Sequence, residues 1–221
     1  MRIWLIRHGE TEHNLRGVFQ GQLDTVLTPH GLEQARLTAR ALDRIEFDGI
    51  FSSDLQRAYQ TAEALAEGRD VSVRPDVRLR ELHYGVLQGI AYADFRDVLR
   101  DHGVDDWGPG VFSDRGVAPP QGESLDDLIR RIDGFMSEIL SDADDRSDVA
   151  IVTHGGTIRT IMTELLGMRA VDRGKLALAN CGVTCFSRSD GGWANDGDWS
   201  LEFHNRVFWS EGLSPTRPTS V

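Results

Sequence analysis

Cysteine is scarce in this chain, which contains two cysteines among 221 residues. If Cys181 and Cys185 lie in an extended strand, the four-residue step separates them by roughly 13 Å, which is too far for a disulfide bond. Unpaired cysteines are typical of a reducing compartment, so we expect a cytoplasmic protein. We interpret both side chains as small buried apolar groups rather than as catalytic thiols.

Long hydrophobic runs are also missing. No segment approaches the ~20 consecutive apolar residues that a membrane span needs. Residues 1–7 contain only a short apolar run between Arg2 and Arg7. A signal peptide needs a longer run, so we interpret this segment as a first β-strand. The sequence predicts neither a membrane span nor a membrane partner.

Positive charge is in short supply. Lys and Arg number 24 against 35 Asp and Glu, which gives a formal net charge of -11. Nucleic acids and anionic membranes attract clustered Lys and Arg, so this balance argues against both kinds of partner. It also makes a group of arginines around one histidine informative, because a bound anion would explain their presence.

The chain has no internal repeat and no low-complexity tract, and its length suits one domain. We expect a single domain over residues 1–213. The last residues, 214–221, contain Pro215 and Pro218 and are expected to form a flexible tail.

Strand patterns alternate with helix patterns along the chain. The expected strands cover residues 2–6, 48–52, 71–74, 149–153, 182–188 and 199–204. The expected helices begin at Pro29 behind the N-cap Thr28, at about residue 55 behind Ser53 or Asp54, and after His154, and two more cover residues 91–101 and 124–140. The apolar stripe of the first helix contains Leu32, Ala35, Ala39 and Leu42.

Such alternation predicts an α/β fold, a three-layer sandwich whose mostly parallel central sheet is flanked by helices on both faces. Ligands of these sheets bind beyond the carboxyl ends of the strands. Three expected strand ends carry polar or charged residues suited to an anion, at residues 7–9, 53–57 and 154–155.

His8 follows the first strand and stands between Arg7 and Gly9. Glycine lets the backbone turn sharply and approach a ligand. Arginine offers a fixed cation with the geometry to bind a phosphate through two N–H groups. A neutral imidazole nitrogen is a competent nucleophile near pH 7, so this triplet suits phosphate chemistry.

His154 and Arg57 occupy comparable positions. His154 precedes the first turn of a helix, whose free N–H groups favour an anion. Arg57 falls in the first turn of another helix, where positive charge opposes the helix dipole. Arg57 then either meets a bound anion or turns to solvent. Either histidine alone is better explained as structural, but His8 and His154 at corresponding strand ends together favour a site.

Glu81 lies in a segment that reads RLRELHYG over residues 78–85. It is either a salt-bridged loop carboxylate or, if the site keeps it protonated, a group that supplies a proton to a leaving oxygen.

Five segments in order resemble the histidine phosphatase superfamily, the phosphoglycerate-mutase-like family. They read RHGETEHN at 7–14, FQGQLDTVLTPHG at 19–31, SSDLQRAYQTA at 52–62, RELHYG at 80–85 and THGG at 153–156. An isolated Arg-His-Gly is weak evidence, but the ordered set spans nearly the whole chain. The chain is therefore identified by resemblance as a member of this superfamily.

The resemblance implies a role for each matching residue. His8 would be the nucleophile that becomes phosphohistidine, and Glu81 would protonate the leaving alcohol and then activate water. The phosphoryl oxygens would be bound by Arg7, Arg57 and His154, with help from Asn14 and the Gly155 backbone. The rest of the substrate would meet Gln20, Gly21 and Tyr84. The resemblance implies no metal and no cofactor, and the sequence shows no metal-ligand spacing.

Phosphatases and phosphoglycerate mutases both occur in this family. In the family, mutases carry a longer insertion after the glutamate segment, and here only residues 85–122 fill that place. The closing segment LEFHN, 201–205, also resembles the phosphatase branch. We therefore expect a phosphomonoesterase acting on a small phosphorylated metabolite. A cofactor-dependent mutase is the alternative, because ELHYG at 81–85 resembles the mutase version, and a non-catalytic phosphate-binding protein is a further one.

The sequence leaves the substrate open. Residues 89–122 are expected to set specificity. Trp107, Phe112 and Arg115 are candidates to shape the pocket, but core or surface packing is the preferred interpretation of each. Phe208 and Trp209 either support a homodimer or form a satellite of the core.

Overall fold

The computed structural model describes residues 1–104, 115–142, 147–191 and 197–209. The predicted tail, Trp107 and Phe112 lie outside these residues. Arg115 is exposed, and its guanidinium pairs with Glu164 at 2.7 Å on the surface. Within the described residues, no helix is both long and apolar enough to cross a membrane.

A six-stranded sheet forms the centre, in the order β3-β2-β4-β1-β5-β6. The strands are β1 (Arg2–Arg7), β2 (Gly49–Ser52), β3 (Val73–Pro75), β4 (Asp148–Thr153), β5 (Val183–Gly191) and β6 (Gly197–Arg206). Strands β3, β2, β4 and β1 run parallel, whereas β5 is antiparallel to β1 and β6 to β5. The prediction of a mostly parallel sheet is confirmed.

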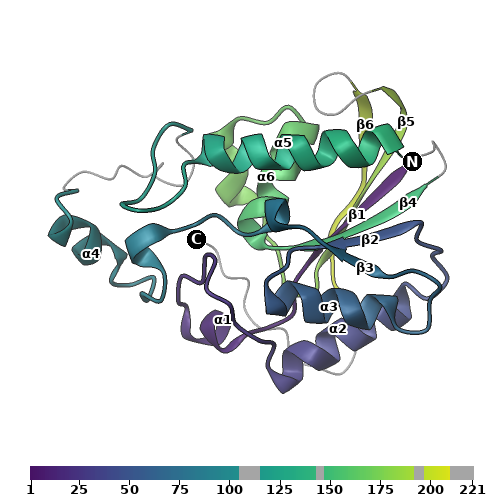
Figure 1. Cartoon of the computed structure of the whole chain (residues 1–221), viewed down its shortest axis with the longest axis horizontal. Coiled ribbons are helices and arrows are strands. Elements are labelled where there is room, and N and C mark those ends of the chain that lie inside the picture. Colours follow the sequence, from purple (N-terminus) through teal and green to yellow (C-terminus); the bar gives the residue numbers. More distant parts are fainter. Residues whose placement is uncertain (105–114, 143–146, 192–196, 210–221) are drawn as a thin grey trace.

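Helices cover both faces of the sheet (Figure 1), as predicted. The helices α5 (Leu125–Asp142) and α6 (Gly155–Leu165) lie over one face, and α2 (Pro29–Ala41) and α3 (Gln56–Ala66) lie over the other. Strand β1 shows why both faces must be covered. Its residues alternate between faces, with Ile3 and Leu5 in the core under α5 and α6 and Trp4 and Ile6 in the core over α3.

The shorter elements gather beyond the carboxyl ends of the parallel strands. They are α1 (Glu12–Arg16), α4 (Phe95–Asp101) and three 3₁₀ turns at Val77–Leu79, Gly85–Leu87 and Ala170–Lys175. The helix predicted at 91–101 thus begins four residues later. The residues before it instead pair with the segment near residue 18 through an isolated bridge between Val18 and Ala91.

One predicted helix cap is confirmed and another is wrong. Thr28 caps α2, and its hydroxyl accepts a hydrogen bond from Gly31 N at 2.9 Å. Helix α3 begins after Leu55 with no side-chain cap. Asp54 fails as a cap because its carboxylate accepts from Arg80 Nε at 2.7 Å. Ser53 stands two residues before the N-cap position at Leu55, and its hydroxyl accepts from Leu55 N at 3.3 Å.

The apolar stripe predicted for α2 is wrong at Leu32, which is 43% exposed, whereas Ala35 and Leu42 are buried. Of the two alternatives for Trp209, the structure supports a satellite of the core. Trp209 is 1% exposed, packs against Leu27 and Ala35, and donates from Nε1 to Asn180 O at 2.8 Å.

Both cysteines are free and buried. Cys181 precedes β5 and has a left-handed backbone conformation with φ 52°, whereas Cys185 lies within β5. The two cysteines therefore do not lie in one extended strand. Burial raises the pKa of both thiols, that of Cys185 to about 12. A protonated buried thiol is a poor nucleophile, which agrees with their predicted role as apolar packing groups.

Substitution of Phe135 tests the packing of the core under α5. Its side chain is 0% exposed and meets Phe51 edge-on, with the ring centroids 5.4 Å apart. Phe135→Ala should lower the free energy of unfolding by about 3–5 kcal/mol, because it removes a buried ring and leaves a cavity. Chemical denaturation measures the change, and Leu15→Ala at a 56% exposed position is the control. A loss below about 1 kcal/mol in Phe135→Ala would contradict this packing.

Candidate active site

A polar pocket of about 60 Å³ opens beyond the carboxyl ends of β1, β2 and β4. Its lining comes from the loops and helices that follow these strands, as expected for a parallel sheet. The lining residues are Arg7, His8, Asn14, Gln20, Gly21, Arg57, Glu81, Tyr84, Tyr92, Gly155, Gly156 and Arg159. Every residue proposed from the sequence for catalysis or substrate binding lines this pocket except His154. The roles proposed for these residues stay predictions.

His8 is 3% exposed, and its backbone N–H continues the sheet by donating to Thr153 O at 2.9 Å. Its Nδ1 lies 2.7 Å from Gly9 O. A carbonyl oxygen only accepts, so Nδ1 carries the proton and Nε2 keeps its lone pair. Burial, with Arg57 and Arg7 nearby, lowers the pKa of His8 well below 6.5, so the ring is neutral at pH 7.

Gly9 holds this turn by close packing. A Cβ built on it would lie 2.6 Å from Gly31 O at the start of α2, so a larger residue would push β1 and α2 apart. Its backbone N–H donates to Thr61 in α3 at 3.0 Å. The small residue is therefore needed for contact with the neighbouring helix.

Arg57 is 1% exposed, which excludes the solvent-facing alternative. Its Nη1 donates to Leu23 O and its Nη2 to Gly21 O, both at 2.7 Å. Its Nε has no hydrogen-bond partner among the described residues. Burial lowers the pKa of Arg57 to about 10, so the buried group remains a cation at neutral pH. The guanidinium thus fixes the 21–23 loop and presents charge to the pocket.

Arg7 is 7% exposed, and its Nη1 donates to Leu178 O at 2.5 Å. Burial lowers the pKa of Arg7, and the nearby cation of Arg159 adds to that effect. Two cations therefore share one side of the pocket, an arrangement that an anion would stabilise.

Asn14 belongs to α1, where it closes a capping box with Thr11. Its Oδ1 accepts from Thr11 N at 3.1 Å and from Asn180 Nδ2 at 3.2 Å. With the oxygen occupied, the amide N–H groups of Asn14 remain for the pocket that it lines. Asn180 Nδ2 also donates to His8 O at 3.0 Å, so one amide ties His8 and Asn14 together.

Glu81 is 8% exposed and held by backbone donors. Its Oε1 accepts from Leu82 N at 2.9 Å and its Oε2 from Gly156 N at 2.8 Å. The second bond connects Glu81 to the first turn of α6, next to His154. These bonds fix where the carboxyl group lies in the pocket.

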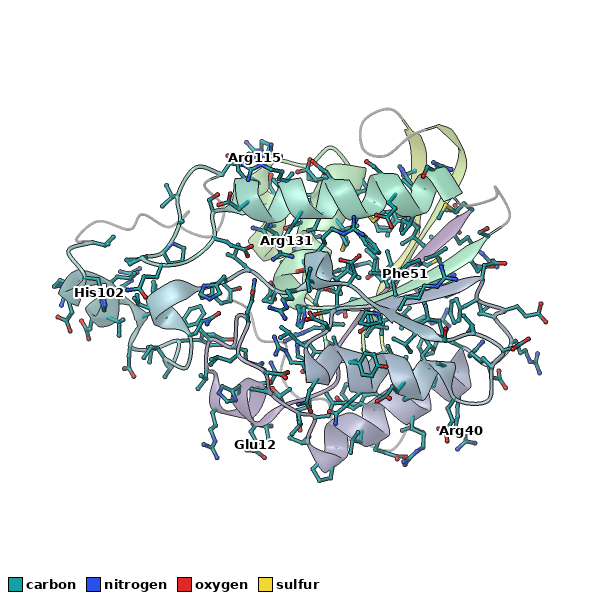
Figure 2. The ribbon with its side chains drawn as sticks, in the orientation of Figure 1. Glu12, Arg40, Phe51, His102, Arg115 and Arg131 are labelled. Carbon is teal, nitrogen blue, oxygen red and sulfur yellow. The ribbon has the colours of Figure 1, made fainter. Side chains whose placement is uncertain are left out.

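Arg131 on α5 holds the segment that carries Glu81 (Figure 2). Its Nη1 donates to Arg78 O and Arg80 O at 2.6 Å, and its Nη2 donates to Glu81 O at 2.9 Å. Glu123 accepts from the same guanidinium at 3.0 Å. One side chain thus ties three backbone carbonyls of this segment to α5.

His154 is the N-cap residue of α6 and is 0% exposed. Its ring centroid lies 5.2 Å from that of His8. Neither of its ring nitrogens has a hydrogen-bond partner among the described residues. Burial and the nearby Arg57 and His8 lower the pKa of His154 well below 6.5. A buried imidazole without partners is costly, so the site favours a ligand that satisfies it.

Tyr84 and Tyr92 form an aromatic wall of the pocket. Phe19 packs edge-on against Tyr84 and Tyr92, with ring centroids 5.2 and 4.5 Å away. Tyr92 N donates to Gly17 O at 2.8 Å, which joins this wall to the loop after α1. Tyr92 belongs to the 89–122 segment predicted to set specificity, and it lines the pocket.

Several residues of the site were missed in the sequence. Arg159 stands four residues after Gly155, one helical turn away on the same face, and that spacing was a usable signal. Tyr92, Asn180 and Arg131 gave no local signal, because each acts through contacts distant in the sequence. Among the described residues, no cluster of three or more His, Cys, Asp or Glu side chains could hold a metal ion.

The chain was compared with known proteins. A family model described as the histidine phosphatase superfamily (branch 1) matches residues 3–197. The glucosyl-3-phosphoglycerate phosphatase of Mycobacterium tuberculosis is 34% identical over 221 residues, with 92% of this chain and 94% of the relative covered. The Probable phosphoglycerate mutase GpmB of Proteus mirabilis is 32% identical over 205 residues, with 91% of each chain covered.

Among solved structures, the phosphoserine phosphatase of Entamoeba histolytica, in complex with 3-phosphoglyceric acid, aligns with a TM-score of 0.76 and 27% identity. The alignment covers 94% of this chain and 98% of that one. The α/β architecture of the described residues is therefore that of a known phosphatase structure.

The buried histidines make stability depend on pH. An unfolded histidine takes up a proton below about pH 6.5, whereas His8 and His154 resist protonation in the fold. The free energy of unfolding should therefore be highest above pH 6.5 and fall below it, by up to about 1.4 kcal/mol per pH unit for each histidine. Denaturant titrations between pH 7.5 and 5.5 measure this slope.

The His8→Asn variant should show a shallower slope, because it removes one of these groups. His13 and His204, whose pKa values are also lowered by burial, account for part of what remains. An unchanged slope in His8→Asn would show that His8 is protonated in the folded state.

Proposed function

The chain belongs to the histidine phosphatase superfamily, and we propose that it is a phosphatase that hydrolyses a small phosphorylated metabolite through a phosphohistidine on His8. The observation that carries the proposal is the neutral His8, with its Nε2 lone pair free, in one pocket with Arg7 and Arg57. The phosphatase relatives described above support the hydrolytic reaction.

In the proposed reaction, His8 Nε2 attacks phosphorus while the bond to the leaving oxygen breaks. The ring can do so without losing a proton, because Nδ1 already donates to Gly9 O. Attack makes the ring cationic, and the same Nδ1–H bond stabilises that charge. Water then attacks the phosphohistidine, which releases phosphate and returns neutral His8.

A phosphoryl transition state spreads charge over its equatorial oxygens, so catalysis is mostly positioning and electrostatic stabilisation. Arg7, Arg57 and His154 would bind these oxygens, with the Asn14 amide and the Gly155 backbone. The unsatisfied nitrogens of Arg57 and His154 support this assignment, because a phosphoryl group would supply the acceptors that they lack.

Glu81 would protonate the leaving oxygen and then accept a proton from the attacking water. Its carboxyl group lies in the pocket beside Gly156, on the same side as His154. Gln20, Gly21 and Tyr84 would contact the rest of the substrate. All three line the same pocket as His8.

A phosphoglycerate mutase is the second candidate, because the GpmB relative carries that name. A mutase would return the phosphoryl group from His8 to the same molecule rather than to water. A non-catalytic phosphate-binding protein would use the same pocket without turnover.

His8→Ala tests the proposal. The wild type should release phosphate from para-nitrophenyl phosphate and from some members of a metabolite-phosphate panel in EDTA, and His8→Ala should lower the rate by at least about 10³-fold, because the nucleophile is lost. His102→Ala, at an exposed histidine of the chain, is the control and should keep full activity.

Near-normal turnover in His8→Ala would contradict the phosphohistidine mechanism. Conversion of 3-phosphoglycerate to 2-phosphoglycerate that needs a bisphosphoglycerate primer, without phosphate release, would favour the mutase. Phosphate binding with no turnover of any panel member would favour the binding protein.

Arg131→Met tests the support of Glu81. Without its bonds to the 78–81 carbonyls, Glu81 should be misplaced, and kcat/KM for an alkyl phosphate should fall roughly 10-fold or more. The loss should be smaller for para-nitrophenyl phosphate, whose leaving group needs no proton. Arg130→Met is the matched control, since Arg130 is exposed and pairs only with Asp127 among the described residues. Equal losses for both substrates would contradict an effect through Glu81.

A further inference from the structure

Arg159 is a cation of the pocket for which the proposed phosphoryl chemistry has no use. It lies on α6, four residues after Gly155, which places it about 6 Å further along the helix axis on the same face. Its side chain is partly exposed and lines the pocket. Its Nη1 lies 3.5 Å from where a Cβ on Gly155 would stand, and Arg7 Nε lies 3.7 Å from the same point, so the two guanidinium groups are neighbours at the start of α6.

The structure holds this guanidinium in place without neutralising it. Its Nε donates to Leu176 O at 3.0 Å, which fixes its orientation. Among the described residues, no carboxylate forms an ion pair with Arg159. Glu164, on the same helix, pairs with Arg115. Both oxygens of Glu81 accept backbone N–H groups.

Other cations surround Arg159. Its charge lowers the pKa of Arg7 and that of the buried Arg173, which shows that these guanidinium groups repel one another. A protein with a net charge of -11 could easily have placed a carboxylate here. A partly buried cation among like charges is stabilised when an anion binds. Arg7 and Arg57 are assigned to the phosphoryl group, so Arg159 remains for a second anion.

We propose that Arg159 binds a carboxylate on the leaving group, so that the substrate is a short phosphorylated carboxylic acid. The inference rests on the proposed phosphatase function. A guanidinium matches a carboxylate through two parallel N–H bonds. Because the guanidinium of Arg159 lies beside that of Arg7, only a few bonds can separate the phosphate from the carboxylate, and the small cavity agrees with a compact molecule.

The aromatic wall of Tyr84 and Tyr92 completes this subsite. Burial raises the pKa of both phenols, so they stay protonated and can donate hydrogen bonds to an anion. Arg159 would thus set specificity, while His8 and Arg57 act on the phosphoryl group of any substrate.

The test compares phosphate esters that differ only in the carboxylate: phosphoserine with phosphoethanolamine, and 3-phosphoglycerate with glycerol 3-phosphate. Each is measured as a substrate and as a competitive inhibitor of para-nitrophenyl phosphate hydrolysis. The wild type should prefer the carboxylate member of each pair. For the carboxylate member, Arg159→Met should lower kcat/KM, or the affinity as an inhibitor, by roughly 10- to 100-fold, mainly through a higher KM. For the member without a carboxylate, the same variant should change these quantities by about twofold or less.

Two further variants sharpen the result. Arg159→Lys keeps the charge without the two-pronged geometry and should retain part of the preference. Arg40→Met removes an exposed arginine of α2, distant from the pocket in Figure 2, and should change neither member of a pair.

Equal losses for both members in Arg159→Met, or a wild type that does not discriminate within the pairs, would overturn the inference. A larger dependence on Arg159 for propanediol bisphosphate than for 3-phosphoglycerate would also overturn it in favour of a second phosphate. Failure of the wild type to hydrolyse even para-nitrophenyl phosphate would instead reject the phosphatase function itself, and with it this assignment.

Discussion

The site depends on the guanidinium of Arg57, a buried cation that forms no ion pair among the described residues. Burial of a cation is costly, and proteins usually offset the cost with an acidic partner. Arg57 instead donates to the carbonyls of Gly21 and Leu23, which orient it but leave its positive charge in place. Burial together with that charge keeps His8 neutral, and the charge gives the pocket its affinity for an anion. Loop 21–23, α3 and the end of β1 are arranged around this one constraint.

Backbone groups also hold the charged side chains next to Arg57. Backbone amides hold Glu81, and Arg131 holds the chain on which it stands, while the carboxylate of Glu123 pairs with Arg131 outside the pocket. The acidic partner is thereby kept with the supporting arginine rather than with the arginines that face the ligand. Arg131, which supports Glu81, is paired with a carboxylate, whereas Arg57 in the pocket lining forms no ion pair among the described residues. The pocket can therefore stay positive in a protein that is acidic as a whole.

The sequence predicted what depends on local pattern and order. The alternation of strands and helices gave the sheet and its two helical layers, and the rule on strand ends located His8, Arg57 and His154 together. Prediction failed where a distant residue decides. Asp54 has the chemistry of an N-cap, but Arg80 binds it instead. Leu32 fits the spacing of an apolar stripe, but nothing covers it enough to bury it. Arg131 resembles its neighbour Arg130 in sequence, and only the tertiary fold separates the buried support from the exposed residue.

The position of β1 in the sheet has a consequence for the order in which the chain folds during synthesis. This strand leads into His8 and is made first, yet both of its neighbours, β4 and β5, come from the last third of the chain. At 5–20 residues per second, the ribosome needs roughly 7 to 30 s to travel from Arg2 to its partner Asp148. During that interval a strongly apolar strand has no native sheet partner, and such segments are those that chaperones bind. Asn180 then donates to the His8 carbonyl, and Trp209 donates to the Asn180 carbonyl, so His8 reaches its final position only when almost the whole chain has been made.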